Sequence, residues 1–145
     1  MSVSSWRSPL LAALVALLAT ALPGCGSDSG SSVIPTPTET TETFTGTLSP
    51  SGTNTMIFYA KAGQVTVTLT SITPDSTLLY GMVVGVYNPY YLVCTPVSTN
   101  SSITQGQSLV GLATATTELC VQLVDMRGVI PPTGSESYTI TATHF

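Results

Sequence analysis

Residues 63–70 read Gly-Gln-Val-Thr-Val-Thr-Leu-Thr, and their strict alternation decides the fold class. Val65, Val67 and Leu69 recur at every second position, with threonines between them. Side chains of a β-strand point alternately to opposite faces, so a period of two predicts a strand with one buried side and one solvent-facing side. Threonine is β-branched and suits the outer, pleated surface of such a strand.

The same two-residue period recurs before and after this stretch. Alternating segments lie at residues 43–48, 55–60, 119–124 and 138–143, and shorter apolar segments lie at 91–94 and 108–113. Residues 78–87 are apolar on both faces, which predicts a central strand covered on both sides. Gly81 and Gly85 within it indicate a close approach or a β-bulge. Turn residues such as Ser49-Pro50-Ser51-Gly52 separate the segments.

About eight short strands without an amphipathic helix predict an all-β fold, an antiparallel and jelly-roll-like β-sandwich, with a closed barrel as the alternative. Charge is scarce: charged residues make up 7% of the 145 residues, whereas ordinary soluble domains carry roughly 25%. The formal net charge is −4, and Lys61 and Arg127 are the only lysine or arginine after Arg7. Nucleic-acid binding needs several cationic contacts to phosphate, and docking on anionic lipid needs a basic cluster. The sequence therefore predicts no nucleic-acid partner and no electrostatic membrane docking.

Residues 1–24 divide as an export signal does. Met1–Arg7 is a short segment with one positive charge, and an apolar block of about 14 residues follows. A transmembrane helix needs about 20 apolar residues, so this block is too short to span a bilayer. Leu22-Pro23-Gly24-Cys25 comes next and resembles the lipobox of bacterial lipoproteins, in which the leader is cut before an acylated cysteine. That resemblance implies that Cys25 carries lipid, such as palmitate, and anchors the chain in a membrane.

The residue after the cysteine bears on the destination. Gly26 is not the Asp that marks retention in the inner membrane, so the resemblance implies the outer membrane, with the domain in the periplasm or at the cell surface. Ala19-Thr20-Ala21 matches an ordinary signal-peptidase site and leaves open a secreted protein without lipid. Residues 25–42 are rich in Ser, Thr, Pro and Gly and predict a disordered spacer, followed by the sandwich domain at 43–145.

The number of cysteines bears on whether the chain contains a disulfide. Three cysteines in an exported protein leave one unpaired unless one is modified. If Cys25 carries lipid, Cys94 and Cys120 remain, and we predict a disulfide between them because export places them in an oxidising compartment. Such a bridge closes a loop of about 25 residues and contributes roughly 3–4 kcal/mol. With no CxxC motif and one histidine, the sequence predicts no metal and no cofactor.

The order of the segments also resembles a known family. ETFTGTLSPSGTNTMIFYAKAGQVTVTLTS (42–71), LLYGMVVGVYNP (78–89), LCVQLVD (119–125) and SYTITATHF (137–145) together resemble the bacterial pre-peptidase C-terminal domain. The resemblance covers residues 42–145 and implies a β-sandwich of the kind appended to exported enzymes. Roles in secretion, attachment or substrate binding are implied with it. In this sequence no enzyme precedes the domain.

Tyr87-Asn88-Pro89-Tyr90-Tyr91 holds three of the six tyrosines around an Asn-Pro turn. Tyrosine offers a flat apolar face and a polar tip. Tyr87, Tyr90 and Tyr91 are therefore candidate ligand-binding residues for a sugar ring or for a partner's apolar surface. The alternative is structural: Tyr87 and Tyr91 pack into the ends of the sandwich while Tyr90 caps the turn.

Residues with catalytic or metal-binding chemistry are few and scattered. His144 is the sole histidine, and there is no G-x-S-x-G segment, so we expect His144 to be a strand residue that faces water. Asp75 and Asp125 are candidate calcium ligands, but no loop places oxygen ligands at alternate positions. These observations favour a non-enzymatic binding module on a lipid anchor, with carbohydrate or protein as ligand. The alternatives are a structural or assembly subunit of the cell envelope, whose sheet edges pair with neighbours, and then a hydrolase.

Overall fold

The computed structural model of the chain describes residues 37–145. The predicted signal peptide at 1–24, Cys25 with its lipid, and most of the predicted spacer lie outside the described residues. Within residues 37–145, no helix is long and apolar enough to cross a membrane.

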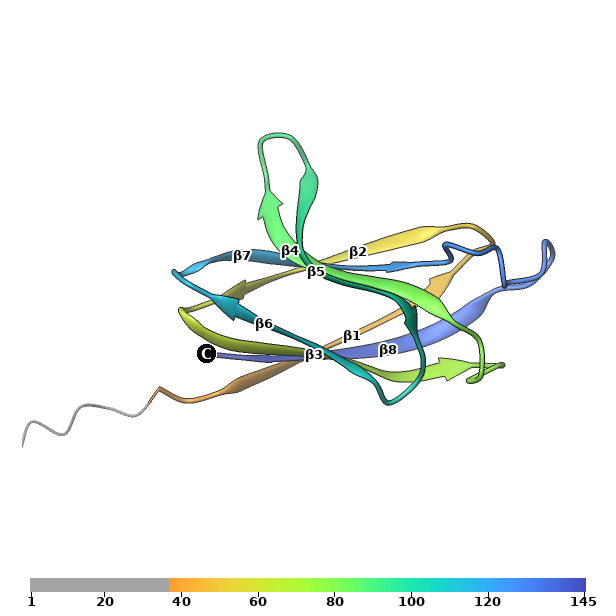
Figure 1. Cartoon of the computed structure of the whole chain (residues 1–145), viewed down its shortest axis with the longest axis horizontal. Helices are drawn as coiled ribbons and strands as arrows, with labels where there is room; N and C mark the ends of the chain where they lie inside the picture. The colour runs from red at the N-terminus through yellow and green to blue at the C-terminus, as the bar shows by residue number, and fades with distance from the viewer. Residues whose placement is uncertain (1–36) are drawn as a thin grey trace, which may run out of the picture. The chain divides into compact units, whose positions relative to one another are not determined.

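The described chain forms two four-stranded antiparallel sheets (Figure 1). One has the order β1-β8-β3-β6 and the other the order β2-β7-β4-β5. The strands are β1 (Thr40–Leu48), β2 (Thr53–Ala60), β3 (Gly63–Thr73), β4 (Tyr80–Asn88), β5 (Val93–Ile103), β6 (Ser108–Ala113), β7 (Thr117–Val124) and β8 (Glu136–His144). The predicted fold class, an all-β antiparallel sandwich of eight strands, is confirmed.

The strand pairing follows a simple rule. β1 pairs with β8, β2 with β7, β3 with β6 and β4 with β5, so the chain doubles back at the β4–β5 turn into one long two-stranded ribbon. The ribbon then wraps, which adds the pairs β3 with β8 and β4 with β7 and produces the two sheets. This is jelly-roll topology. It makes the β4–β5 hairpin the closed end of the ribbon.

The core lies between the inner faces of the sheets, and the alternating sequence decides which residues enter it. In β3, Val65, Val67 and Leu69 are buried, whereas the threonines between them are half-buried or exposed. Burial of each such aliphatic side chain contributes about 1.5–3 kcal/mol. Other large side chains that are fully buried are Tyr80, Leu48, Ile72, Met82, Ile103, Leu123, Ile130 and Ile140.

Hydroxyl groups take the place of charges on the outer face of the β1-β8-β3-β6 sheet. Side-chain oxygens pair across strands in Thr41–Thr143 at 2.9 Å, Thr70–Thr141 at 3.1 Å and Thr68–Ser108 at 2.7 Å. Thr41 lies directly opposite Thr143, and Thr68 lies directly opposite Ser108, and such cross-strand pairs stabilise a sheet. The scarcity of Lys and Glu in the sequence therefore reflects a surface built from threonine.

β5 is much longer than the sequence indicates. The apolar segment at 91–94 predicts a short strand, but β5 runs from Val93 to Ile103. Its later part contains Pro96 and several polar residues and lacks the alternation that marks the other strands. β5 is an edge strand that pairs only with β4, so a proline is tolerated and polar side chains reach water.

Candidate binding site at the β4–β5 hairpin

The tip of the β4–β5 hairpin carries the three most exposed large apolar side chains of residues 37–145. Tyr90, Tyr91 and Leu92 are 84%, 70% and 76% exposed, and Val93 follows at 50%. Figure 1 shows the distal part of the hairpin rising away from the sandwich, where no second sheet covers it. A contiguous group of exposed apolar side chains is typical of a contact site.

Local interactions fix the conformation of this tip. Asn88 Oδ1 accepts hydrogen bonds from the backbone N–H groups of Tyr90, at 3.0 Å, and Tyr91, at 3.2 Å. Leu92 has a φ of 55°, a left-handed conformation that is rare for a branched residue. Such strained positions cost roughly 1–3 kcal/mol and cluster at ligand contacts. The ring centroids of Tyr90 and Tyr91 are 4.8 Å apart, edge to face.

A disulfide ties the base of the hairpin to the sandwich. It joins Cys94 of β5 to Cys120 of β7, with Cα atoms 5.9 Å apart. β4 lies between these two strands, so the bridge crosses it at Gly85. A Cβ at position 85 would overlap the carbonyl oxygen of Thr95 and lie 3.2 Å from Cys94 Sγ. Only glycine fits there, and the ladder shifts register between Val84 and Gly85, where the sequence indicates a close approach or a bulge.

The structure separates the three candidate tyrosines. Tyr90 and Tyr91 lie together at the tip, whereas Tyr87 is half-buried on β4, opposite Cys94. The structural alternative is wrong for Tyr91, which does not pack into the sandwich. Leu92 belongs to the same exposed group and is not among the candidate residues predicted from the sequence. The available signal is the apolar run that continues directly after the Asn-Pro turn.

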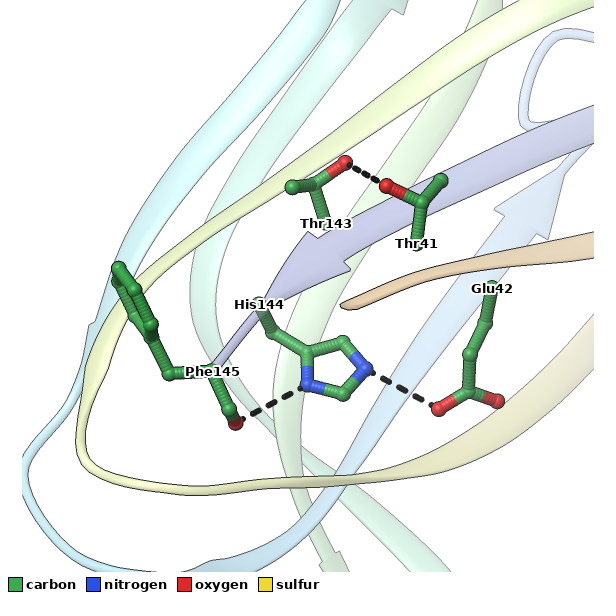
Figure 2. Close-up of polar contacts among 5 residues, drawn as sticks. All are labelled: Thr41, Glu42, Thr143, His144 and Phe145. Atoms are coloured by element: carbon green, nitrogen blue, oxygen red, sulfur yellow. Dashed lines mark hydrogen bonds and ion pairs between the residues drawn. The ribbon is translucent and has the colours of Figure 1, made fainter. Parts of the chain in front are cut away.

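His144 lies in a small polar cluster where β8 meets β1 (Figure 2). The expectation that it faces water is wrong, because it is 4% exposed. Every second residue of β8 is buried, and His144 continues that series. Its Nε2 lies 3.0 Å from Glu42 Oε1, and its Nδ1 lies 3.2 Å from the carbonyl oxygen of Phe145.

The contacts of His144 link the first and last strands. Both ring nitrogens face oxygen atoms that accept hydrogen bonds, and neither bonds a hydroxyl or thiol within residues 37–145. A general base must be within hydrogen-bond reach of the group that it deprotonates. The ring packs against Phe58 of the opposite sheet, with centroids 5.1 Å apart. Glu42 belongs to β1, which begins inside the predicted spacer at Thr40, so the pair ties the first strand to the last.

The acidic residues considered for calcium accept local hydrogen bonds. The buried carboxylate of Asp125 accepts hydrogen bonds from three backbone N–H groups, those of Ser51, Val129 and Ile130. The hydroxyl and then the backbone N–H of Thr77 donate to Asp75 and hold the pKa of Asp75 below its ordinary value. Among residues 37–145, no three or more His, Cys, Asp or Glu side chains are grouped to hold a metal ion.

Tyr80 is buried near these acids. Its hydroxyl has no hydrogen-bond partner among the described residues. Burial, followed by the negative charges of Glu136, Asp125 and Asp75, raises the pKa of Tyr80. The phenol is therefore neutral over the whole physiological range.

Comparison with known proteins places the fold but no family. No protein-family model matches the chain, and no curated protein is significantly similar in sequence, so the pre-peptidase resemblance gains no family match. A mitogen derived from Yersinia pseudotuberculosis is similar in structure, at 14% identity and a TM-score of 0.53, over 74% of this chain and 88% of that one. PliG from Aeromonas hydrophila, a periplasmic inhibitor of g-type lysozyme, has 17% identity and a TM-score of 0.46, over 72% of this chain and 84% of that one. The likeness to the mitogen extends to the fold alone.

Proposed function

We propose that this chain is a non-catalytic binding module outside the cytoplasm that contacts a protein partner through the tip of the β4–β5 hairpin. The observation that carries this proposal is the run of exposed apolar side chains from Tyr90 to Leu92 on a turn whose backbone is fixed. Because the tip is preorganised, little conformational entropy is lost on binding. Buried aromatic anchors of this kind dominate the binding energy of protein interfaces.

The chemistry of the tip favours a protein over a carbohydrate. A sugar site combines an open aromatic face with polar side chains that fix the orientation of the ligand. The ring planes of Tyr90 and Tyr91 meet at 88°, so the two rings do not form one flat platform. Leu92 and Val93 beside them are apolar, and the side-chain oxygen of Asn88 is already used within the turn.

The disulfide supports a location outside the cytoplasm, because such bonds persist in oxidising compartments. Acylation of Cys25 would hold the domain at a membrane, in the outer membrane if the cell has two. Intact-mass analysis of the protein from its native membrane tests this part of the proposal. A mass that matches an unmodified chain cleaved after Ala21 would replace the anchored protein with a secreted one.

Site-specific photocrosslinking in the native bacterium tests the contact itself. p-Benzoylphenylalanine replaces Tyr90 and, in a matched control, Tyr59, an exposed tyrosine of β2 on the sandwich. We expect a discrete adduct with one protein from position 90 and none from position 59. Equal adducts from both positions, or none from position 90, contradict the proposal. Glycan-array binding that disappears in Tyr90→Ala would identify a carbohydrate ligand instead.

A further inference from the structure

An apolar groove of about 240 Å³ lies at the base of the hairpin, between the inner faces of the two sheets. Its inner wall includes the buried side chains Val65, Val84 and Leu119, and its rim includes the exposed side chains Val86, Val97 and Leu112. Buried and exposed side chains thus line the same groove, on the two strands from which the hairpin rises (Figure 1) and on their neighbours. The hydrophobic core therefore reaches the surface at this groove.

A glycine leaves this groove open. In β6, the residues two positions before and after Gly111 are Leu109 and Ala113, and both are buried. Because side chains alternate along a strand, position 111 also points into the sandwich. A Cβ built on Gly111 meets nothing within 4 Å, and its φ is not left-handed. Neither close packing nor backbone conformation therefore requires glycine at this position. Glycine inside a strand often marks a place that a ligand approaches closely.

The size and chemistry of the groove restrict its occupant. An apolar cavity of about 150 Å³ holds one benzene molecule, and small-molecule sites are usually above about 300 Å³. At about 240 Å³, the groove fits one bulky side chain. Its lining contains no charged residue, and Ser98, Thr114 and Thr117 supply its only side-chain hydroxyls. An ionic group would lose its hydration there without gaining a partner.

The groove is continuous with the exposed tip. In the hairpin ladder Val86 pairs with Thr95 and Asn88 with Val93, so Val86 and Val93 lie on the same face of the hairpin. Val86 lines the groove, and Val93 belongs to the exposed tip. We propose that the groove receives one bulky apolar side chain, aromatic or branched aliphatic, from the same protein that contacts the tip. This inference rests on the proposed function and adds a second anchor point to it.

Methyl NMR with amino-acid amides tests the pocket directly. The probes are N-acetyl-tryptophanamide and N-acetyl-leucinamide, with N-acetyl-glutaminamide as the polar control. The full chain carries Cys25→Ser, so that no acyl chain or detergent competes. We expect saturable shifts of the Val65, Val84 and Leu119 methyl signals with the two apolar amides only. Gly111→Leu fills the groove and weakens this binding at least roughly tenfold, the usual effect of losing an anchor pocket.

Two variants of the same strand are matched controls for this experiment. Gly111→Ala adds one methyl group, leaves room for a probe and retains binding. Val110→Leu changes the neighbouring, outward-facing position and retains it as well. Absence of shifts overturns the inference. Decanoate binding more tightly than either amide overturns it in favour of a lipid chain, and shifts that depend on protein concentration without a probe overturn it in favour of a second copy of this chain.

Photocrosslinking distinguishes the failure of the groove proposal from the failure of the proposed tip contact. With the photoreactive residue at position 90, Gly111→Leu lowers the yield of the adduct several-fold, and Val110→Leu does not change it. An adduct whose yield is unaffected by Gly111→Leu overturns the groove and leaves the tip contact standing. If the chain that retains Gly111 gives no adduct from position 90, the proposed function is contradicted. The inference that one protein occupies both the tip and the groove is then contradicted as well.

Discussion

The tip of the β4–β5 hairpin and the His144–Glu42 corner differ in whether a second sheet covers them. At the corner, β8 keeps alternating under the cover of the opposite sheet, and a polar histidine is buried against Phe58. At the tip, the ribbon extends beyond the sandwich, and Tyr90 and Leu92 are exposed although both are apolar. Periodicity assigns a side chain to a face of the strand. Only the presence of a second sheet decides whether that face is buried.

The disulfide joins the base of the hairpin to β7 of the sandwich, and removing it should have the largest effect. Cys94→Ser with Cys120→Ser opens a loop with a sequence separation of 26 residues. On the chain-entropy model, the free energy of unfolding should fall by about 3–4 kcal/mol. Urea unfolding followed by circular dichroism measures it, with the reduced wild-type chain as the control. A fall below about 1 kcal/mol would mean that the unfolded chain gains little freedom when the hairpin is released.

The covered corner should give the next largest effect. His144→Ala removes a buried ring and leaves Glu42 without its partner, at a cost of about 1–3 kcal/mol of unfolding free energy. A double-mutant cycle with Glu42→Ala isolates the pair, and we expect a coupling energy of at least about 0.5 kcal/mol. Thr143→Ser, one position away on the outer face, is the matched control. Additive single effects would show that packing on Phe58 alone holds the histidine.

The sequence predicts the covered part of the molecule well. Alternation at 63–70 identifies β3 and its inward residues, and the doubly apolar segment at 78–87 identifies β4 as an internal strand of its sheet. The prediction that β4 is covered on both sides is wrong for its second half, where Val83 is half-buried and Val86 is exposed, because no third layer covers the outer face of this sheet. The same alternation, carried one step past Ala142, buries His144, because the position of a residue in the strand, and not its polarity, decides which face it occupies. Alternation does not reveal the full length of β5, because the polar side chains of an edge strand can reach water.

Only one half of the candidate site, the tip, can be predicted from the sequence. Tyr90 and Tyr91 stand out because aromatic residues flank an Asn-Pro turn, and that local signal survives in the structure. The groove depends on where the hairpin leaves the sandwich and on which face of β6 Gly111 occupies. Both are consequences of strand pairing between distant segments. No local pattern in the sequence contains them.

Leu92, the strained residue of the tip, should affect the free energy of unfolding and the contact with the partner in opposite directions. Leu92→Asn keeps the left-handed turn with a residue that tolerates it, and it should raise the free energy of unfolding by up to about 1 kcal/mol. The same change removes an exposed apolar side chain, so the adduct formed from position 90 should become scarcer. Urea unfolding and crosslinking yield are measured on the same variant. A variant that loses stability would show that Leu92 makes packing contacts that outweigh its strain.

Asp75 gives the smallest effect, because its carboxylate accepts hydrogen bonds from Thr77 of the same loop, although its backbone N–H donates to Glu136 of β8. The Thr77 hydroxyl and backbone N–H donate to Asp75 Oδ1 at 2.6 Å and 2.9 Å and lower the pKa of Asp75 from its ordinary 3.8. A carboxylate whose pKa is lower in the folded state adds stability above its unfolded pKa, and that contribution is lost as the pH falls through the folded pKa. Thr77→Val removes the hydroxyl donor, so an NMR titration should show the pKa of Asp75 rising toward 3.8, with the tip and the corner unchanged. Since the two residues are two positions apart, this interaction follows from the local sequence alone. An unchanged pKa would assign the whole effect to the backbone N–H, and shifted signals at Tyr90 or His144 would mean that the loop is coupled to regions from which the fold separates it.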